Sequence, residues 1–250
     1  GAVTIRAGTT STGTLDVNQA ISTVSTTANT AGGSVILEAN GAITTAATNG
    51  TITTTGFGNA AGGEVFIDHT AGVAGAITLN GSITAKGGTG GTAGNGGVVT
   101  VYNQNGAIAL NAPINVSLGG TGTNDGAIQL KATGNITDAS NAGLIGDTSG
   151  QLKVYSTGGK IDLSSSTTNA MKTASFQTDT TGADGSVKYY DTSDLTLNTV
   201  AAGLGTLTAP STASANIGAT TNAVSTVAGS TNGAVTIRAG TTSTGTLDVN

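Results

Sequence analysis

The residues that could carry out acid–base or metal chemistry are few in this chain of 250 residues. His69 is the only histidine and there is no cysteine, so a zinc site or a Ser-His-Asp triad has no second partner to recruit. We therefore interpret His69 as a polar residue at the end of a strand. The sequence predicts no catalytic residue, no metal site and no bound cofactor.

The carboxylates are the next candidates, because enzymes that cleave polysaccharides use clustered acids in a cleft, often beside Lys or Arg. Three close pairs occur: Glu64 with Asp68 on the same face of one predicted strand, Asp191 with Asp194 around a turn, and Asp179 with Asp184 in DTTGADG. None belongs to a dense or repeated acidic set, so the sequence predicts that the chain is not an enzyme. DTTGADG could offer oxygen ligands to calcium, but it is not repeated, and an Asp/Gly turn is the preferred interpretation.

Three further motifs suggest binding. The glycine-rich GGTGGTAGNGG (87–97) lacks the lysine of a phosphate-binding loop and opens no predicted helix. TITTTG presents Thr51, Thr53 and Thr55 as an ice-binding ladder would, but the neighbouring segments VTI, VIL, VFI and VTV do not continue the ladder. Four Asn-x-Ser/Thr sequons leave glycosylation open, at Asn49, Asn80, Asn115 and Asn135.

Short segments that begin with glycine and then alternate apolar and polar residues must position all of these side chains. They are GAVTIRA (1–7), GSVILEA (33–39), GEVFIDH (63–69), GVVTVYN (97–103), GAIQLKA (126–132), GQLKVYS (150–156), GSVKYYD (185–191), GTLTA (205–209) and GAVTIRA (233–239). Alternation over four to seven residues predicts β-strands, and Val, Ile and Thr favour them. Two shorter strands follow most of these segments, for example in NGAITTA (40–46) and NGTITTTG (49–56).

Three short strands in about 29 residues, repeated about eight times, predict a parallel β-helix. Each coil buries its apolar residues only by stacking on its neighbours. Glycine and Asn-Gly mark the corners, because these residues adopt positive φ at little cost. The pattern weakens at 163–178 and 199–232, where we expect less regular coils or a larger loop.

A longer repeat is superimposed on the coils. GAVTIRAGTTSTGTLDVN at 1–18 recurs without a substitution at 233–250, an offset of 232 residues. We therefore interpret 1–232 as one tandem unit and 233–250 as the start of an identical next unit.

The composition excludes several classes of function. Only 8% of residues are charged, against about 25% in typical proteins, and the net charge is −5. The eight basic residues are scattered and aromatics make up 3%, so we expect no nucleic-acid binding. No apolar run approaches the roughly 20 residues of a membrane-spanning helix. The absence of cysteine excludes a disulfide framework and fits a large bacterial surface protein.

Several segments resemble the shaft repeats of filamentous-haemagglutinin-like adhesins, which are large bacterial exoproteins of the two-partner secretion and autotransporter kinds. They are GSVILEANGAITT, GAITLNGSITAKGG, ATGNITDASNAGLIGDTSGQLKVYSTGGKIDL and DLTLNTVAAGLGTLTAP. The resemblance implies a secreted right-handed parallel β-helix that forms an elongated shaft or filament at a bacterial cell surface.

We therefore expect an extracellular structural repeat that forms a stiff shaft for attachment or filament assembly. Its partners would be identical neighbouring units stacked end to end, with lateral self-association and surface glycans as further options. The loops at 56–63, 87–97 and 119–125 are the expected binding surface if the shaft binds a ligand. Two alternatives remain open: a carbohydrate-active β-helix enzyme, and a β-helix that binds ice or polysaccharide.

Overall fold

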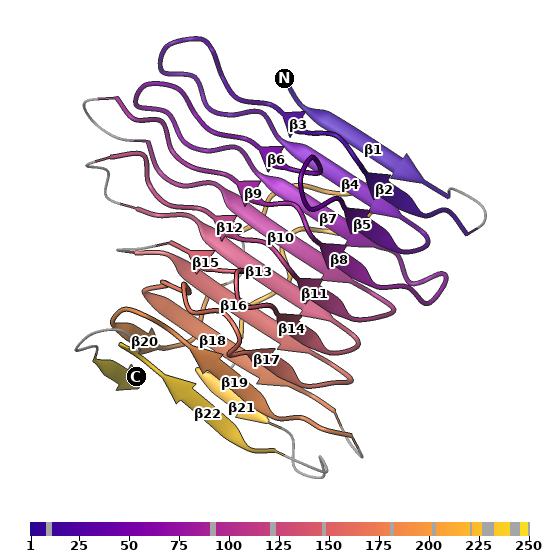
Figure 1. Ribbon diagram of the computed structural model, residues 1–250, viewed down its shortest axis with the longest axis vertical. Helices are drawn as coiled ribbons and strands as arrows, with labels where there is room; N and C mark the ends of the chain where they lie inside the picture. The colour runs from indigo at the N-terminus through magenta and orange to yellow at the C-terminus, as the bar shows by residue number, and fades with distance from the viewer. Residues whose placement is uncertain are drawn as a thin grey trace.

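The chain winds into a stack of coils whose strands align in three parallel sheets (Figure 1), as seen in a computed structural model. The structure describes residues 1–8, 12–90, 94–120, 124–146, 149–180, 183–201, 204–220, 222–226, 233–240 and 246–249. Neighbouring strands in each sheet come from successive coils. The architecture is therefore a parallel β-helix of about eight coils, as the sequence predicts.

The three sheets, counted over the described residues, differ in strand length. Sheet A has ten strands: β1 (Val3–Ala7), β4 (Val35–Ala39), β7 (Val65–His69), β10 (Val98–Asn103), β13 (Ala127–Ala132), β16 (Gln151–Ser156), β18 (Thr173–Thr178), β20 (Leu195–Leu197), β21 (Val224–Thr226) and β23 (Leu247–Val249). Sheet B has eight: β2 (Leu15–Val17), β5 (Ile43–Thr45), β8 (Ile77–Leu79), β11 (Ile108–Leu110), β14 (Ile136–Asp138), β17 (Ile161–Leu163), β19 (Val187–Tyr190) and β22 (Val235–Arg238). Sheet C has five: β3 (Ile21–Ser22), β6 (Ile52–Thr53), β9 (Ile83–Thr84), β12 (Ile114–Asn115) and β15 (Leu144–Ile145).

The core lies between the sheets and is built from columns of aliphatic side chains. In sheet B, Ile43, Ile77, Ile108, Ile136 and Ile161 follow one another in register, and all are fully buried. Because side chains alternate between the two faces of a strand, every second residue of each strand enters this core. The branched side chains suit the pleat, which explains why so few aromatic residues are needed.

Six of the glycine-led segments form the sheet A strands expected of them, from GAVTIRA at 1–7 to GQLKVYS at 150–156. Beyond these six segments, the prediction that each glycine-led segment supplies the same strand of its coil is wrong. GSVKYYD (185–191) and the second GAVTIRA (233–239) supply strands of sheet B, and GTLTA (205–209) lies outside the coil. TASFQT (173–178), which has no preceding glycine, forms β18 in sheet A instead.

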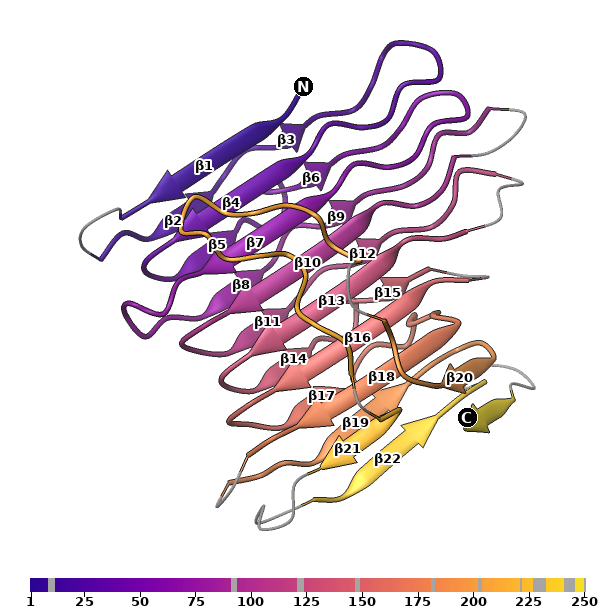
Figure 2. The same ribbon diagram turned by 180° about the vertical axis from the view of Figure 1, so that it is seen from behind.

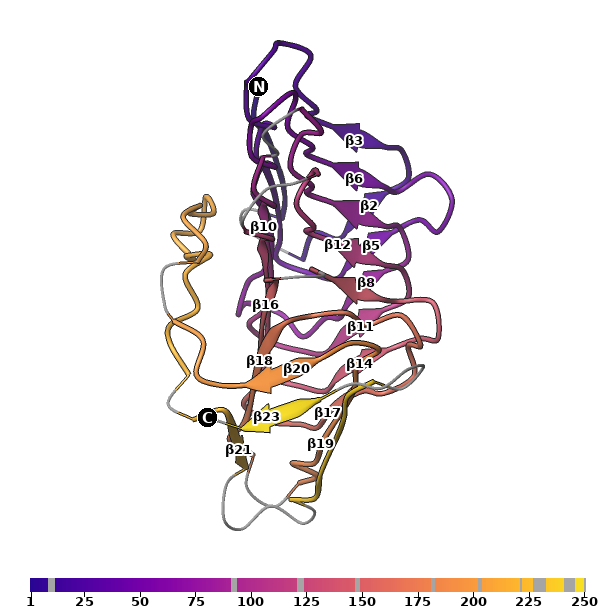
Figure 3. The same cartoon turned by 90° about the vertical axis from the view of Figure 1, so that its left-hand side faces the viewer.

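The segment 204–220, here called the strap, leaves the coil between β20 and β21. It folds back as a hairpin over the outer face of sheet A (Figures 2 and 3). Thr208 and Ser214 form an antiparallel bridge, and Thr212 closes the turn with a φ of 70°. The strap agrees with the loop expected at 199–232, although 202–203, 221 and 227–232 lie outside the described residues.

Candidate functional surface

The outer face of sheet A carries polar and aromatic side chains, and the strap covers part of it. Phe66 points outward from β7 yet is fully buried, because the strap residues Ala209 and Ala215 pack on it. Ile36, Tyr102, Leu207 and Ala213 surround this small cluster. The strap therefore closes a second apolar core on the outside of the coil stack.

Two carboxylates singled out in the sequence anchor the strap. Glu64 accepts hydrogen bonds from the backbone N–H and hydroxyl of Thr206, at 2.7 and 2.6 Å, and from the N–H of Leu207 at 3.0 Å. Asp68 accepts bonds from the Ser211 hydroxyl at 3.2 Å and the Gln104 amide at 2.9 Å. The pair lies on one face, as expected, and burial raises the pKa of Asp68.

Sequence reasoning missed three other residues that hold the strap, namely Glu38, Gln129 and Lys153. Glu38 forms an ion pair with Arg6 and accepts the Ser211 N–H at 2.6 Å. The Gln129 amide donates to the carbonyl of Ala215 at 3.1 Å. Aligning the strands would have placed Glu38 beside Asp68, but only the strap shows what these side chains bind.

Lys153 completes the anchor from the middle of β16. Its ammonium donates to the carbonyl oxygens of Ala201, at 2.7 Å, and Gly218. The side chain is 1% exposed, and this burial lowers the pKa of Lys153 to about 8. Carboxylates thus bind the N–H groups of the strap while an amide and an ammonium bind its carbonyls. The outer face of sheet A therefore hydrogen-bonds both the N–H groups and the carbonyls of the strap backbone.

A cation–aromatic column lies on the same outer face. Lys131 lies between Tyr102 and Tyr155, with its Nζ 4.9 and 5.4 Å from their ring centroids. The Tyr155 hydroxyl donates to Asp179, and burial is the main reason that the pKa of Tyr155 rises to about 12. Such contacts stabilise neighbouring coils by about 0.5–1 kcal/mol each at exposed sites.

The other two carboxylate pairs do not form joint sites. Asp191 is buried and accepts bonds from Met171 N–H at 3.0 Å and the Tyr189 hydroxyl at 2.6 Å, whereas Asp194 accepts the N–H of Thr246 at 2.8 Å. Their partners are different, so each carboxylate fixes a separate turn.

Asp179 and Asp184 are likewise used separately. The Gln177 amide donates to Asp179 at 3.1 Å, and Ser186 N–H donates to Asp184 at 3.0 Å. Residues 181 and 182 of DTTGADG lie outside the described residues.

The predicted loops stack on one another at the corner between sheets C and A. Gly88 and Gly90 donate their N–H groups to the carbonyls of Ala60 and Gly58, both at 2.8 Å. The hydrogen bonds between successive coils therefore extend into the loops 56–63 and 87–97. Residues 91–93, and residues 121–123 of the predicted loop 119–125, lie outside the described residues.

The threonines and sequons show no continuous array. Thr53 is in register with Thr84, but Ser22 and Asn115 occupy the adjoining positions of that column. Asn49 and Asn135 are exposed, whereas Asn80 and Asn115 are half-buried.

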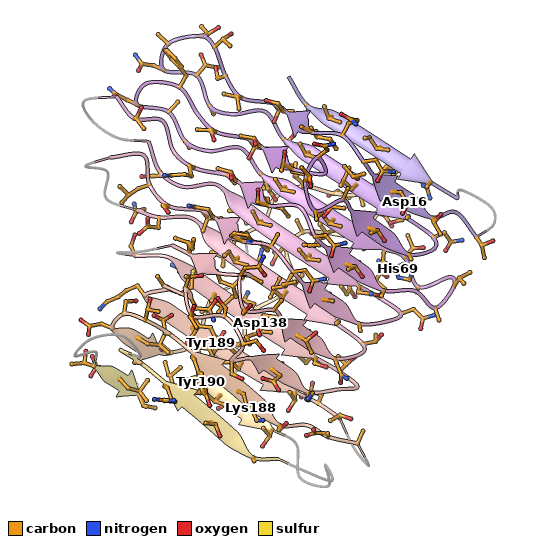
Figure 4. The ribbon with its side chains drawn as sticks, in the orientation of Figure 1. Asp16, His69, Asp138, Lys188, Tyr189 and Tyr190 are labelled. Atoms are coloured by element: carbon orange, nitrogen blue, oxygen red, sulfur yellow. The ribbon has the colours of Figure 1, made fainter. Side chains whose placement is uncertain are left out.

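His69 ends β7 with its side chain fully buried at the turn toward sheet B (Figure 4). Neither ring nitrogen has a hydrogen-bond partner among the described residues. Burial lowers its pKa below the usual 6.5, and the nearby Asn103 amide opposes the shift only in part. The ring therefore remains neutral at pH 7.

Because His69 is buried, the free energy of unfolding is expected to fall in mild acid. Below pH 6.5 the unfolded chain takes up a proton at His69 that the folded chain does not bind, so the free energy of unfolding falls by up to about 1.4 kcal/mol per pH unit until the folded pKa is reached. We expect His69→Asn to lack this loss, since Asn103 occupies the same column in the next coil. Urea unfolding of both proteins from pH 7.5 to 5 measures the difference. Parallel pH profiles would contradict the prediction.

Within the described ranges, no group of three or more His, Asp or Glu side chains is placed to hold a metal ion, and no pocket opens on the surface. No described helix is long and apolar enough to span a membrane. Comparisons with protein-family models, curated proteins and solved structures return no match.

Proposed function

We propose that the chain is a structural repeat of a secreted bacterial surface protein, in which stacked coils form a stiff shaft for attachment or filament assembly. Identical units placed end to end are its principal partners. The extracellular location is supported by the resemblance to haemagglutinin-like shafts, the low charge and the absence of cysteine.

The observation that carries this proposal is the strict register of successive coils. In sheet A, β1, β4 and β7 pair residue for residue over their whole length, from Val3 with Val35 to Ala39 with His69. Hydrogen bonds run along the axis of the stack, so bending it requires many backbone bonds to open together. Even the protruding loops pair with the loops of adjoining coils. These features give stiffness in one direction, which is the property a shaft requires.

Electron cryo-microscopy of the native assembly tests the proposal. We expect a rod with a layer spacing of about 4.8 Å along its axis. Separate globules, or folded beads joined by linkers, would refute the shaft.

A further inference from the structure

The two identical copies of GAVTIRAGTTSTGTLDVN occupy different faces of the coil. In the first copy VTIRA forms β1 of sheet A and LDV forms β2 of sheet B. In the second copy VTIR forms β22 of sheet B, and LDV forms β23, which pairs with β20. The order of the two strands is kept: VTIR has moved from sheet A to sheet B, and LDV has moved from sheet B to the strand that follows it, β23, which joins the edge of sheet A through β20.

The coils just before the second copy show how this offset arises. TASFQT and GSVKYYD are both of the long-strand type, yet they lie on successive faces as β18 and β19. Sheet B strands have three residues up to β17 and four in β19 and β22. The short β20 then stacks on the start of β18, through Thr196 with Thr173 and Leu197 with Ala174. After β18, the longest strand of the coil therefore lies in sheet B instead of sheet A.

Side-chain contacts fit the second copy to its new position. Val235 and Ile237 stack on the buried Val187 and Tyr189 in register. Arg238 lies over the ring of Tyr190 at 5.0 Å. Arg6, the same residue in the first copy, forms an ion pair with Glu38 of the coil that follows it, on the opposite side of its strand. The contact with Tyr190 is therefore made by the face of the copy that meets the preceding coil.

We infer that the edge formed by β19 and β20 is the docking surface for the next identical unit, and that each unit joins the shaft turned by one face of the coil. This inference rests on the proposed function, since it specifies how the stacked units meet. From the first long strand of one unit to that of the next, the chain makes seven coils and moves on by one face. The first long strand therefore returns to the same face after three units. The straps of consecutive units then lie on successive faces of the shaft, which displays the strap surface all round the axis.

Paired cysteines in the full chain test the offset, because the natural sequence has no cysteine. Lys188 pairs in register with Thr236, and both side chains are exposed. Figure 4 labels Lys188 and the nearby Tyr190. Neighbouring strands about 4.8 Å apart place opposed residues within the Cα range of a disulfide. The matched control is Gln177→Cys with Arg238→Cys. Gln177 lies in the sheet A column that Arg6 occupies in the first coil, so Arg238 would approach it if both copies used the same face.

Under mild oxidation we expect K188C/T236C to form the intramolecular disulfide in most chains, and Q177C/R238C to form none. The reverse result overturns the offset while leaving the stacked shaft intact. If neither pair forms, the second copy does not dock on the β19 edge and the inference also fails. The layer spacing in cryo-microscopy reports the shaft independently, so loss of the offset and loss of the shaft are distinguishable. Circular dichroism of each single-cysteine variant confirms that the coil has formed.

Discussion

Replacing Gly97 by alanine is expected to destabilise the coil stack by about 3 kcal/mol or more, at the upper end of what overpacking costs. Gly97 precedes β10, and an added Cβ would lie closer than 3.0 Å to the carbonyl oxygen of Gly63 in the previous coil. That oxygen belongs to the backbone, so it cannot rotate away as a side chain would. Gly97 N–H also donates to the Ala85 carbonyl at 2.7 Å, which holds the strand in place from the other side.

The same glycine position recurs in each early coil, which provides a matched control. Gly33, Gly63 and Gly126 would each bring a Cβ against the carbonyl of the glycine one coil before. Gly1 occupies this position in the first coil and has nothing within 4 Å of an added Cβ. We therefore expect Gly1→Ala to change stability by less than about 0.5 kcal/mol. Amide hydrogen exchange of β10 and urea unfolding followed by circular dichroism measure both variants. Equal stability of the two variants would show that close stacking at this corner is not required.

The glycine corners also explain why so much of the coil could be predicted from the sequence. A glycine followed by an alternating segment indicates two structural features. The glycine indicates that two backbones approach closely, and the alternation indicates that every second side chain is buried. Val35 and Leu37 are fully buried as that pattern predicts, and Glu38 points outward. The Ile residues of sheets B and C follow because an Asn-Gly or Gly corner precedes many of them.

The phase of the later coils could not be predicted by the same rule. Residue 172, before β18, is lysine. A search for glycine followed by an alternating segment therefore misses β18 and assigns the next glycine-led segment to its place. GSVKYYD satisfies the pattern equally well on sheet A or sheet B, because both faces require alternating burial. Which face it takes depends on how many strands precede it, and that count is not encoded locally.

A loop was expected in this region, but its packing on sheet A could not be predicted from the sequence, for a different reason. Its apolar residues are small and irregularly spaced, and its partners lie far away in the chain, as with Thr206 and Glu64. The carboxylates were recognised, but as possible acid catalysts rather than as acceptors for backbone N–H groups. Lys153 gave no signal, since a lysine in an alternating strand normally faces water.

Truncating Phe176 to alanine is expected to cost about 3–5 kcal/mol, the usual range for a buried aromatic side chain. Phe176 is fully buried, and its ring centroid lies 5.0 Å from that of Tyr189. Its column holds only aliphatic residues in earlier coils, such as Leu130 and Val154. The two aromatic rings enter the core where sheet C has ended among the described residues, beyond β15 and the single bridge from Ile145 to Ala170.

This location predicts a local loss of structure rather than a uniform one. A β-helix transmits stability between adjoining coils, so a cavity beside Tyr189 should expose β18 to β22 to hydrogen exchange while β4 to β10 remain protected. Phe57→Ala is the control, because Phe57 is 47% exposed and should lose almost nothing. Phe176→Leu should recover most of the stability, since leucine fills the same column at Leu37 and Leu130. If exchange instead rises evenly along the stack, the rings do not substitute for the missing third sheet, and the coil is held at that level by its backbone ladders alone.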